Sequence, residues 1–168
     1  MRVHVIGLGN DHRGDDAAGL AAARRLQERL AEVAPAVDVR VHGGEPVDLL
    51  HLWAGADLAV LIDAADDGGP PGRVLRVAYG EDALPRGRRG ASSHAFDLPL
   101  ALELGERMHA LPPRLVLYLV TGAGFAAGAP LTPEVEAALP ELTDRVETEV
   151  RMALRDGPDP SGGRSARA

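Results

Sequence analysis

Short apolar runs alternate with longer amphipathic segments along most of this chain. The apolar runs have the length of a buried or half-buried β-strand and fall at residues 3–7, 37–41, 58–62, 73–79 and 115–120. The longer segments have apolar side chains at the spacing of one helix face and fall at residues 15–32, 45–54, 92–110 and 132–154. This order of elements predicts an α/β fold.

Strands and helices that alternate in this way build three layers. We expect a mostly parallel five-stranded twisted sheet with helices on both faces, of the phosphorylase/hydrolase-like kind. The third and fourth strands are joined by a short Gly/Pro turn, which predicts that one strand pair is antiparallel. Residues 1–155 are expected to form a single domain, and the Gly-, Pro- and Ser-rich residues 156–168 a disordered tail.

Small polar residues mark the expected helix starts. Asp15 is placed to act as the N-cap of the first helix, and Ser92 or Ser93 as the N-cap of the third. Thr132 followed by Pro133 is the typical opening of the last helix, with Thr as N-cap and Pro at the first helical position.

Composition narrows the chemistry. The chain has no Cys, which removes disulfides, thiolate nucleophiles and zinc-finger sites together. The net charge of −7 argues against a nucleic-acid partner. The N-terminal residues are too polar for a signal peptide, and no apolar run approaches the roughly 18 residues of a membrane span. We therefore expect a cytoplasmic protein that binds neither nucleic acid nor membrane.

Three acid–base side chains are candidates for a divalent metal site: Asp16, Asp63 and His94. Asp16 opens the first helix, Asp63 follows the most apolar run, and His94 opens the third helix. Two carboxylates and one imidazole leave coordination positions open to a substrate. Each residue also has a structural interpretation. Asp16 suits the positive end of a helix, Asp63 can cap a turn, and His94 can be a surface histidine.

The glycines after the first strand suggest a second hypothesis, a nucleotide-binding α/β module. Gly7 and Gly9 match the start of the dinucleotide fingerprint G-x-G-x-x-G, but His12 occupies the position of its third glycine. The second strand ends in His42 and Gly43, where that fingerprint expects the acidic residue that binds ribose.

Five fragments of the chain, in order, resemble the hydrogenase maturation proteases. These are cytoplasmic endopeptidases that trim the C-terminus of the large subunit of nickel–iron hydrogenases. The fragments fall at residues 5–19, 42–44, 62–64, 92–94 and 131–135, and the resemblance as a whole extends over about residues 3–150.

The resemblance implies a function and a site. It implies an endopeptidase, acting as a monomer, that removes the C-terminal extension of a nickel–iron hydrogenase large-subunit precursor after nickel insertion. Asp16, Asp63 and His94 match the family's metal-binding and catalytic positions, and Gly43 and Gly44 match a Gly-Gly loop near the substrate. The nickel would be carried by the precursor, and the three side chains would recognise it.

The sequence leaves the mechanism open. A metal ion could polarise the scissile carbonyl or activate a water, or a carboxylate could act as general base in an aspartic-type reaction. Asp16 stands where some members of the family carry Glu. Residues 122–128 have no polar or charged side chains, where many relatives have polar or acidic residues. This difference is also compatible with another hypothesis, a non-catalytic assembly factor that senses nickel-loaded precursor.

Overall fold

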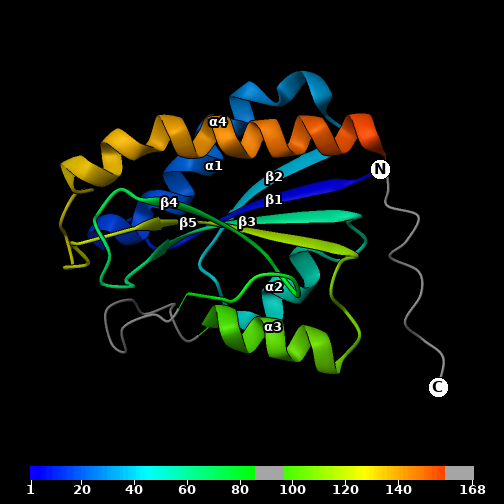
Figure 1. The fold of residues 1–168 in the computed structure, drawn as a ribbon, viewed down its shortest axis with the longest axis horizontal. Coiled ribbons are helices and arrows are strands. Elements are labelled where there is room, and N and C mark those ends of the chain that lie inside the picture. Colours follow the sequence, from blue (N-terminus) through cyan, green and yellow to red (C-terminus); the bar gives the residue numbers. More distant parts are fainter. Residues whose placement is uncertain (86–96, 158–168) are drawn as a thin grey trace.

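The computed structural model describes residues 1–85 and 97–157, and these form one five-stranded sheet between two layers of helices (Figure 1). In the sheet the strands lie in the order β2-β1-β3-β5-β4. Their bounds are β1 Val3–Leu8, β2 Val37–His42, β3 Leu58–Ala65, β4 Val74–Ala78 and β5 Arg114–Thr121. The three-layer α/β architecture expected from the sequence is confirmed.

The helices divide between the two faces of the sheet. In Figure 1, α1 (Ala18–Arg29) and α4 (Pro133–Asp156) cover one face, and α2 (Pro46–Leu52) and α3 (Asp97–Arg107) cover the other. A 3-10 turn, η1 (Gly14–Ala17), connects the loop after β1 to α1. Among the described residues, no helix is both long and apolar enough to cross a membrane.

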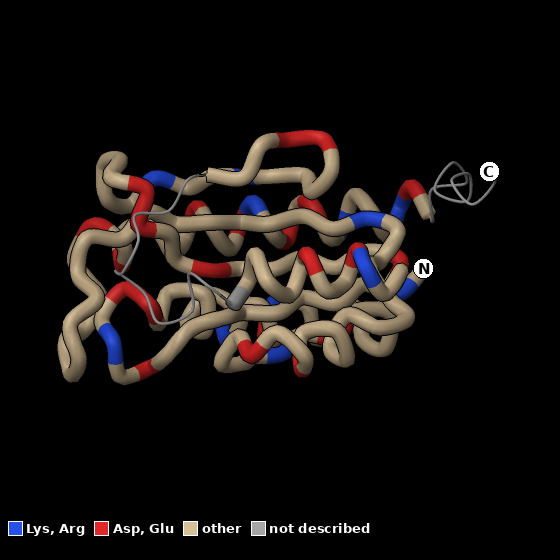
Figure 2. The backbone as a smooth tube through the Cα atoms, turned by 90° about the horizontal axis from the view of Figure 1, so that it is seen from below, with Lys and Arg blue, Asp and Glu red and all other residues tan. Residues whose placement is uncertain are grey.

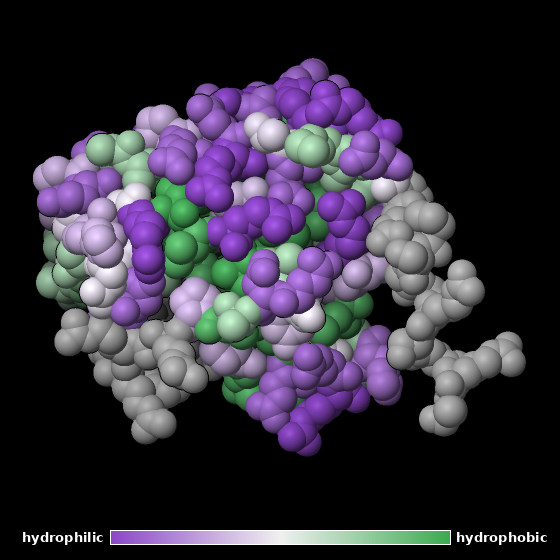
Figure 3. All heavy atoms as spheres, in the orientation of Figure 1, coloured by the Kyte–Doolittle hydropathy of each residue, from purple (hydrophilic) through white to green (hydrophobic). Residues whose placement is uncertain are grey.

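Alternation along the central strand supplies both halves of the core. Leu58, Val60 and Ile62 of β3 pack in the cluster under α1 and α4. Ala59 and Leu61 pack in the cluster under α2 and α3, because successive strand residues point to opposite faces. Figure 3 shows these layers from outside, with apolar atoms between mostly hydrophilic outer surfaces.

One strand pair is antiparallel, as expected, but it is not the pair that the Gly/Pro turn joins, β3 and β4. β4 pairs with β5, with Val77 opposite Leu117, and β5 lies between β3 and β4. The Gly/Pro turn after β3 therefore carries the chain past one strand position, which β5 later fills. The other pairs, β1–β2, β1–β3 and β3–β5, are parallel, so β1, β2, β3 and β5 end at one edge of the sheet.

One of the expected N-caps is wrong. Asp15 lies inside η1, α1 begins only at Ala18, and no side chain caps either element. Thr132 is the N-cap residue of α4 and Pro133 begins the helix, as expected, although the Thr132 hydroxyl makes no capping hydrogen bond. Both side chains instead bond to each other, as described below. Ser92, Ser93 and residues 158–168 of the expected tail lie outside the described residues.

The sheet and α1 approach closely where glycines face each other. A Cβ on Gly7 would lie 2.2 Å from the carbonyl oxygen of Gly19, and one on Gly19 would lie 2.3 Å from those of Ile62 and Leu8. No larger residue fits at either position. This contact sets the start of α1, and η1 before it, directly over the carboxyl ends of β1 and β3.

Candidate functional site

The candidate site lies at the edge of the sheet where the parallel strands end. In Figure 1 this is the end of the molecule away from the N-terminus. Figure 2 shows acidic positions recurring at that end, in the segments that follow the strands. In open α/β sheets, ligands bind in the crevice outside the carboxyl ends of the strands.

Asp16 is fully buried in η1 and is held by the turn that follows β1. Its N–H donates to the carbonyl of Arg13 at 3.2 Å, and its own carbonyl accepts the N–H of Asn10 at 3.3 Å. The turn requires Gly9, whose φ is +137° and whose Cβ would lie 1.7 Å from the carbonyl oxygen of Asp16. The glycine pattern after the first strand thus serves to place Asp16.

Asp63 lies near the carboxyl end of β3, two residues before its last residue, and its exposed fraction is 6%. Its Oδ1 accepts the N–H of Ala64 at 2.8 Å. Burial, and secondarily the charge of Asp16, raise the pKa of Asp63 from 3.8 to about 7. The structural role considered for Asp63, capping the turn after β3, is filled by Asp67, which accepts the N–H of Gly69 at 2.9 Å.

The structure therefore brings together two of the three expected site residues, Asp16 and Asp63. Two carboxylates in a buried setting repel each other, and a cation between them relieves that repulsion. Hard carboxylate oxygens suit a divalent ion, with an imidazole completing a borderline donor set. The donor chemistry thus fits a divalent metal. His94, the third expected residue, lies outside the described residues.

Gly43 and Gly44, expected to form a substrate loop, follow β2 at the same edge of the sheet. The N–H of Gly44 donates to Nδ1 of His42 at 2.9 Å, and Gly44 has φ of +93°. Gly43 lines a pocket of about 420 Å³ together with Gly9 and Asn10, from the turn that carries Asp16. The Gly-Gly loop and that turn are therefore neighbours across this pocket.

The same turn argues against the nucleotide hypothesis. Dinucleotides place their pyrophosphate at the start of the first helix. Here that start is filled by the buried side chains of Asp15 and Asp16, which would repel phosphate.

Asp15 is a site-region residue whose role the sequence did not reveal. Its carboxylate is fully buried and accepts hydrogen bonds from the N–H groups of Ala123, Gly124 and Thr132, at 2.8, 2.9 and 2.7 Å. The hydroxyl of Thr132 lies 3.0 Å from both carboxylate oxygens. Asp15 thus ties η1 to the loop between β5 and α4, whose residues stand more than a hundred positions away.

A second missed cluster joins the end of β2 to α2. His42 Nδ1 lies 3.6 Å from a carboxylate oxygen of Glu45, and its Nε2 lies 3.5 Å from one of Asp48. One ligand atom from each residue falls within 4.8 Å of the others, but both carboxylates are largely exposed. Nδ1 of His42 already accepts the N–H of Gly44, so this cluster holds the Gly43–Gly44 loop in place.

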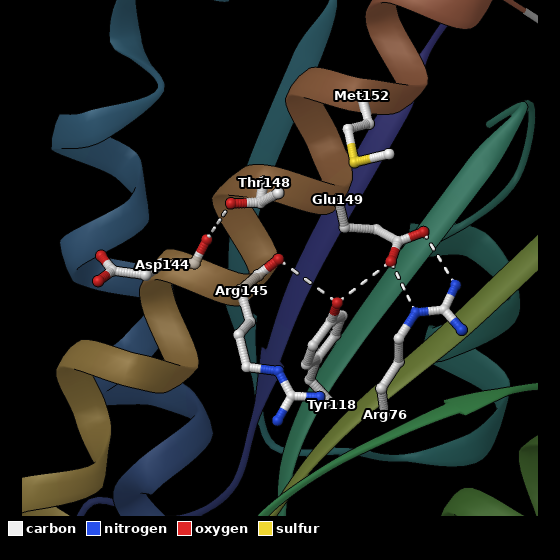
Figure 4. A pocket seen from close by; sticks show the side chains of 7 residues that line it. All are labelled: Arg76, Tyr118, Asp144, Arg145, Thr148, Glu149 and Met152. Carbon is white, nitrogen blue, oxygen red and sulfur yellow. Dashed lines mark hydrogen bonds and ion pairs between the residues drawn. The ribbon is translucent and has the colours of Figure 1, made fainter.

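A second pocket, of about 320 Å³, lies between α4 and the β4–β5 pair (Figure 4). Glu149 accepts two hydrogen bonds from Arg76, at 2.7 and 3.1 Å, and one from the hydroxyl of Tyr118 at 3.1 Å. The Arg76 hydrogen bonds hold the pKa of Glu149 below its ordinary value. The charged groups here satisfy each other, so the network fastens α4 to the sheet.

The fold and the site together define an α/β protein with a buried carboxylate pair at the carboxyl edge of a mostly parallel sheet. A family model described as hydrogenase maturation protease (HycI) matches residues 20–149, which include Asp63 and His94. The chain belongs to the hydrogenase maturation protease family, as the sequence resemblance suggested.

The chain is also similar to individual proteins in sequence and in fold. The chain is 28% identical over 153 residues to the hydrogenase expression/formation protein HupD of Thiocapsa roseopersicina, a match that spans 89% of this chain and 65% of HupD. The structure resembles the hydrogenase maturating endopeptidase HybD from E. coli, with a TM-score of 0.72, 22% identity, and coverage of 90% of this chain and 93% of that one. The [NiFe] hydrogenase maturation protease HybD from Thermococcus kodakarensis has a TM-score of 0.65 and 27% identity, and the match covers 89% and 99% of the two chains.

Proposed function

We propose that this protein is an endopeptidase that removes the C-terminal extension of a nickel–iron hydrogenase large-subunit precursor once nickel has been inserted. The observation that carries the proposal is the buried pair of Asp16 and Asp63 at the carboxyl edge of the sheet, in a chain of this family. Two negative groups at one buried site favour a bound cation over an empty site.

In this proposal the nickel ion is part of the substrate. Asp16, Asp63 and His94 would bind the ion that the precursor presents, and the precursor's scissile peptide would be placed beside them. Carboxylates with one imidazole bind a borderline ion weakly compared with sites that include thiolates. Weak binding suits a protein that must recognise nickel in its substrate and then release the product.

The raised pKa of Asp63 supports a part for this group in proton transfer. Without a bound cation this carboxyl titrates near pH 7, and such a group can accept a proton from an attacking water and return it to the leaving amine. The metal ion, when bound, supplies polarisation of the scissile carbonyl or of that water. We propose Asp63 as the group that moves the proton when it is not bound to the ion.

The Gly43–Gly44 loop is proposed to contact the precursor chain. The support is its position on the pocket beside the turn of Asp16, and the absence of side chains that would keep a peptide at a distance. We further propose that the protein acts as a monomer in the cytoplasm, where the precursor is assembled.

The test is incubation of the purified protein with nickel-loaded and nickel-free precursor, followed by intact-mass spectrometry. Shortening of the nickel-loaded precursor alone supports the proposal. If the precursor binds in a nickel-dependent manner but keeps its full mass, the protein is a non-catalytic assembly factor and the endopeptidase proposal is wrong. A His94→Ala variant in the same assay tests the third proposed ligand, and cleavage at the wild-type rate would remove His94 from the site.

A further inference from the structure

We infer that Asp15 is a positioning residue, which clasps the loop between β5 and α4 and thereby holds Asp16 in place beside Asp63. The inference rests on the proposed function. It also assigns a role to residues 122–128, which have no polar side chains and for which the sequence suggested no role.

The first support is the completeness of the bonds around the Asp15 carboxylate. A carboxylate has about four lone-pair sites, and here three backbone N–H groups and one hydroxyl supply the donors. A buried charge so fully bonded is stable in only one arrangement of its donors, because a lost partner leaves part of the charge unsatisfied. The carboxylate therefore specifies the course of the loop.

The second support is that the main chains also join. The N–H of Asp15 donates to the carbonyl of Gly124 at 2.7 Å, and the N–H of Gly14 donates to that of Ala129 at 3.0 Å. The N–H of Gly128 donates to the carbonyl of His12 at 2.7 Å. The turn before α1 and the loop before α4 are thus bonded at both the side chain and the backbone.

The third support explains the small residues of the loop. A Cβ on Gly122 would lie 2.9 Å from the Cβ of Asp15, and one on Gly14 would lie 2.2 Å from the carbonyl oxygen of Gly124. Larger residues at these positions would push the two segments apart. The absence of a side chain at Gly122 and Gly14 therefore allows the loop backbone to approach Asp15.

The bonds between the Asp15 carboxylate and the loop before α4, which we call the clasp, connect to both members of the carboxylate pair. Asp16 follows Asp15 directly, so its Cα lies about 3.8 Å from the anchored residue. On the other side, the loop leaves β5 at Gly122, whose N–H donates to the carbonyl of Ala65 at 2.9 Å, two residues beyond Asp63 on β3. Asp15 therefore links the turn that carries Asp16 to the strand that carries Asp63.

The test compares Asp15→Asn and Thr132→Val with two controls. Thr132→Ser keeps the hydroxyl, and Val146→Ala weakens the buried face of α4 without touching the clasp. Three experiments are carried out well below each melting temperature. They measure kcat and KM on nickel-loaded precursor, the affinity of the protein for Ni²⁺ alone by calorimetry, and amide hydrogen exchange of Ala123 and Gly124.

For Asp15→Asn we expect kcat to fall by at least about 10-fold with little change in KM, since small misplacements of reacting groups are costly. We expect affinity for Ni²⁺ to fall by about 10–100-fold and exchange at Ala123 and Gly124 to accelerate. Thr132→Val should show the same changes more weakly, and both controls should stay near wild type. Thr132→Val also keeps the test decisive if Asp15→Asn does not fold.

Wild-type kcat and Ni²⁺ affinity in Asp15→Asn and Thr132→Val, with only a lower melting temperature, would overturn the inference and leave Asp15 a stabilising residue. If the wild-type protein itself cleaves no precursor, the proposed function fails. The Ni²⁺ affinities and exchange rates then still decide whether Asp15 positions the carboxylate pair.

Discussion

Asp63 titrates near neutral pH because it is buried in β3 beside the charge of Asp16, and its pKa is raised to about 7. The two residues come from different elements, η1 and β3, and are separated by most of the first half of the chain. The proposed binding of a cation at this site depends on their closeness.

The first prediction concerns stability and pH. Asp63 has a higher pKa in the folded state than the value of 3.8 that it has when unfolded, so folding favours its protonated form. The loss of folding free energy caused by ionising the buried Asp63 is absent below pH 3.8 and grows as the pH rises to about 7. Asp63→Asn, which can still accept the Ala64 N–H, should therefore be more stable than wild type at pH 8, by about 1–4 kcal/mol.

Urea unfolding of both proteins at pH 4 and pH 8 checks this prediction. The difference between them should be small at pH 4 and large at pH 8. Equal stability of the two proteins at pH 8 would show that the charge of Asp63 is not costly, and would contradict the electrostatic description of the site.

The second prediction concerns the coupling between the two carboxylates. Asp16→Asn removes one negative charge, so the pKa of Asp63 should fall below its wild-type value of about 7. Burial is the larger cause of the shift, so the pKa should stay above 3.8. A carbon-13 NMR titration of the Asp63 carboxyl measures both effects. An unchanged pKa would mean that the two groups do not interact.

The third prediction concerns the turn that places Asp16. Gly9→Ala should cost about 2–4 kcal/mol, because the new Cβ meets the carbonyl oxygen of Asp16 and φ is +137°. Gly128→Ala is the matched control, with φ of +74° and no heavy atom near its Cβ. It should cost about 1 kcal/mol. Thermal unfolding compares them, and similar losses in both variants would refute the close contact at Gly9.

The fourth prediction separates the pocket of Figure 4 from the site. Glu149→Gln weakens the hydrogen bonds with Arg76 and Tyr118, and it should lower stability by about 1–2 kcal/mol. Cleavage of the precursor should be unchanged well below the melting temperature. A loss of cleavage with intact stability would show that this pocket takes part in substrate recognition.

The sequence predicted the parts of the fold that local pattern determines. The continuous apolar run at residues 58–62 predicted β3, and the carboxylate that directly follows this run made Asp63 a candidate site residue. The family motifs predicted its pairing with Asp16. The sequence could not predict the partner of β4, because the short turn after β3 is compatible with adjacent pairing or with a skipped strand position.

The role of Asp15 was also beyond the sequence pattern. An aspartate before a helix is most often an N-cap, and local spacing favours that interpretation. Its actual donors, at Ala123, Gly124 and Thr132, are backbone and hydroxyl groups of a distant loop. Backbone donors leave no mark in the residue types that provide them, apart from the small size of the residues around them.

The most direct test of the account is the mass of the nickel-loaded precursor after incubation with Asp63→Asn and with Asp66→Asn. The two variants make the same chemical change three residues apart, and only the first touches the proposed site. We predict that Asp66→Asn shortens the precursor as the wild-type protein does, and that Asp63→Asn leaves it at full length although it remains folded. Cleavage by Asp63→Asn at the wild-type rate would contradict the claim that the buried carboxylate pair performs the reaction.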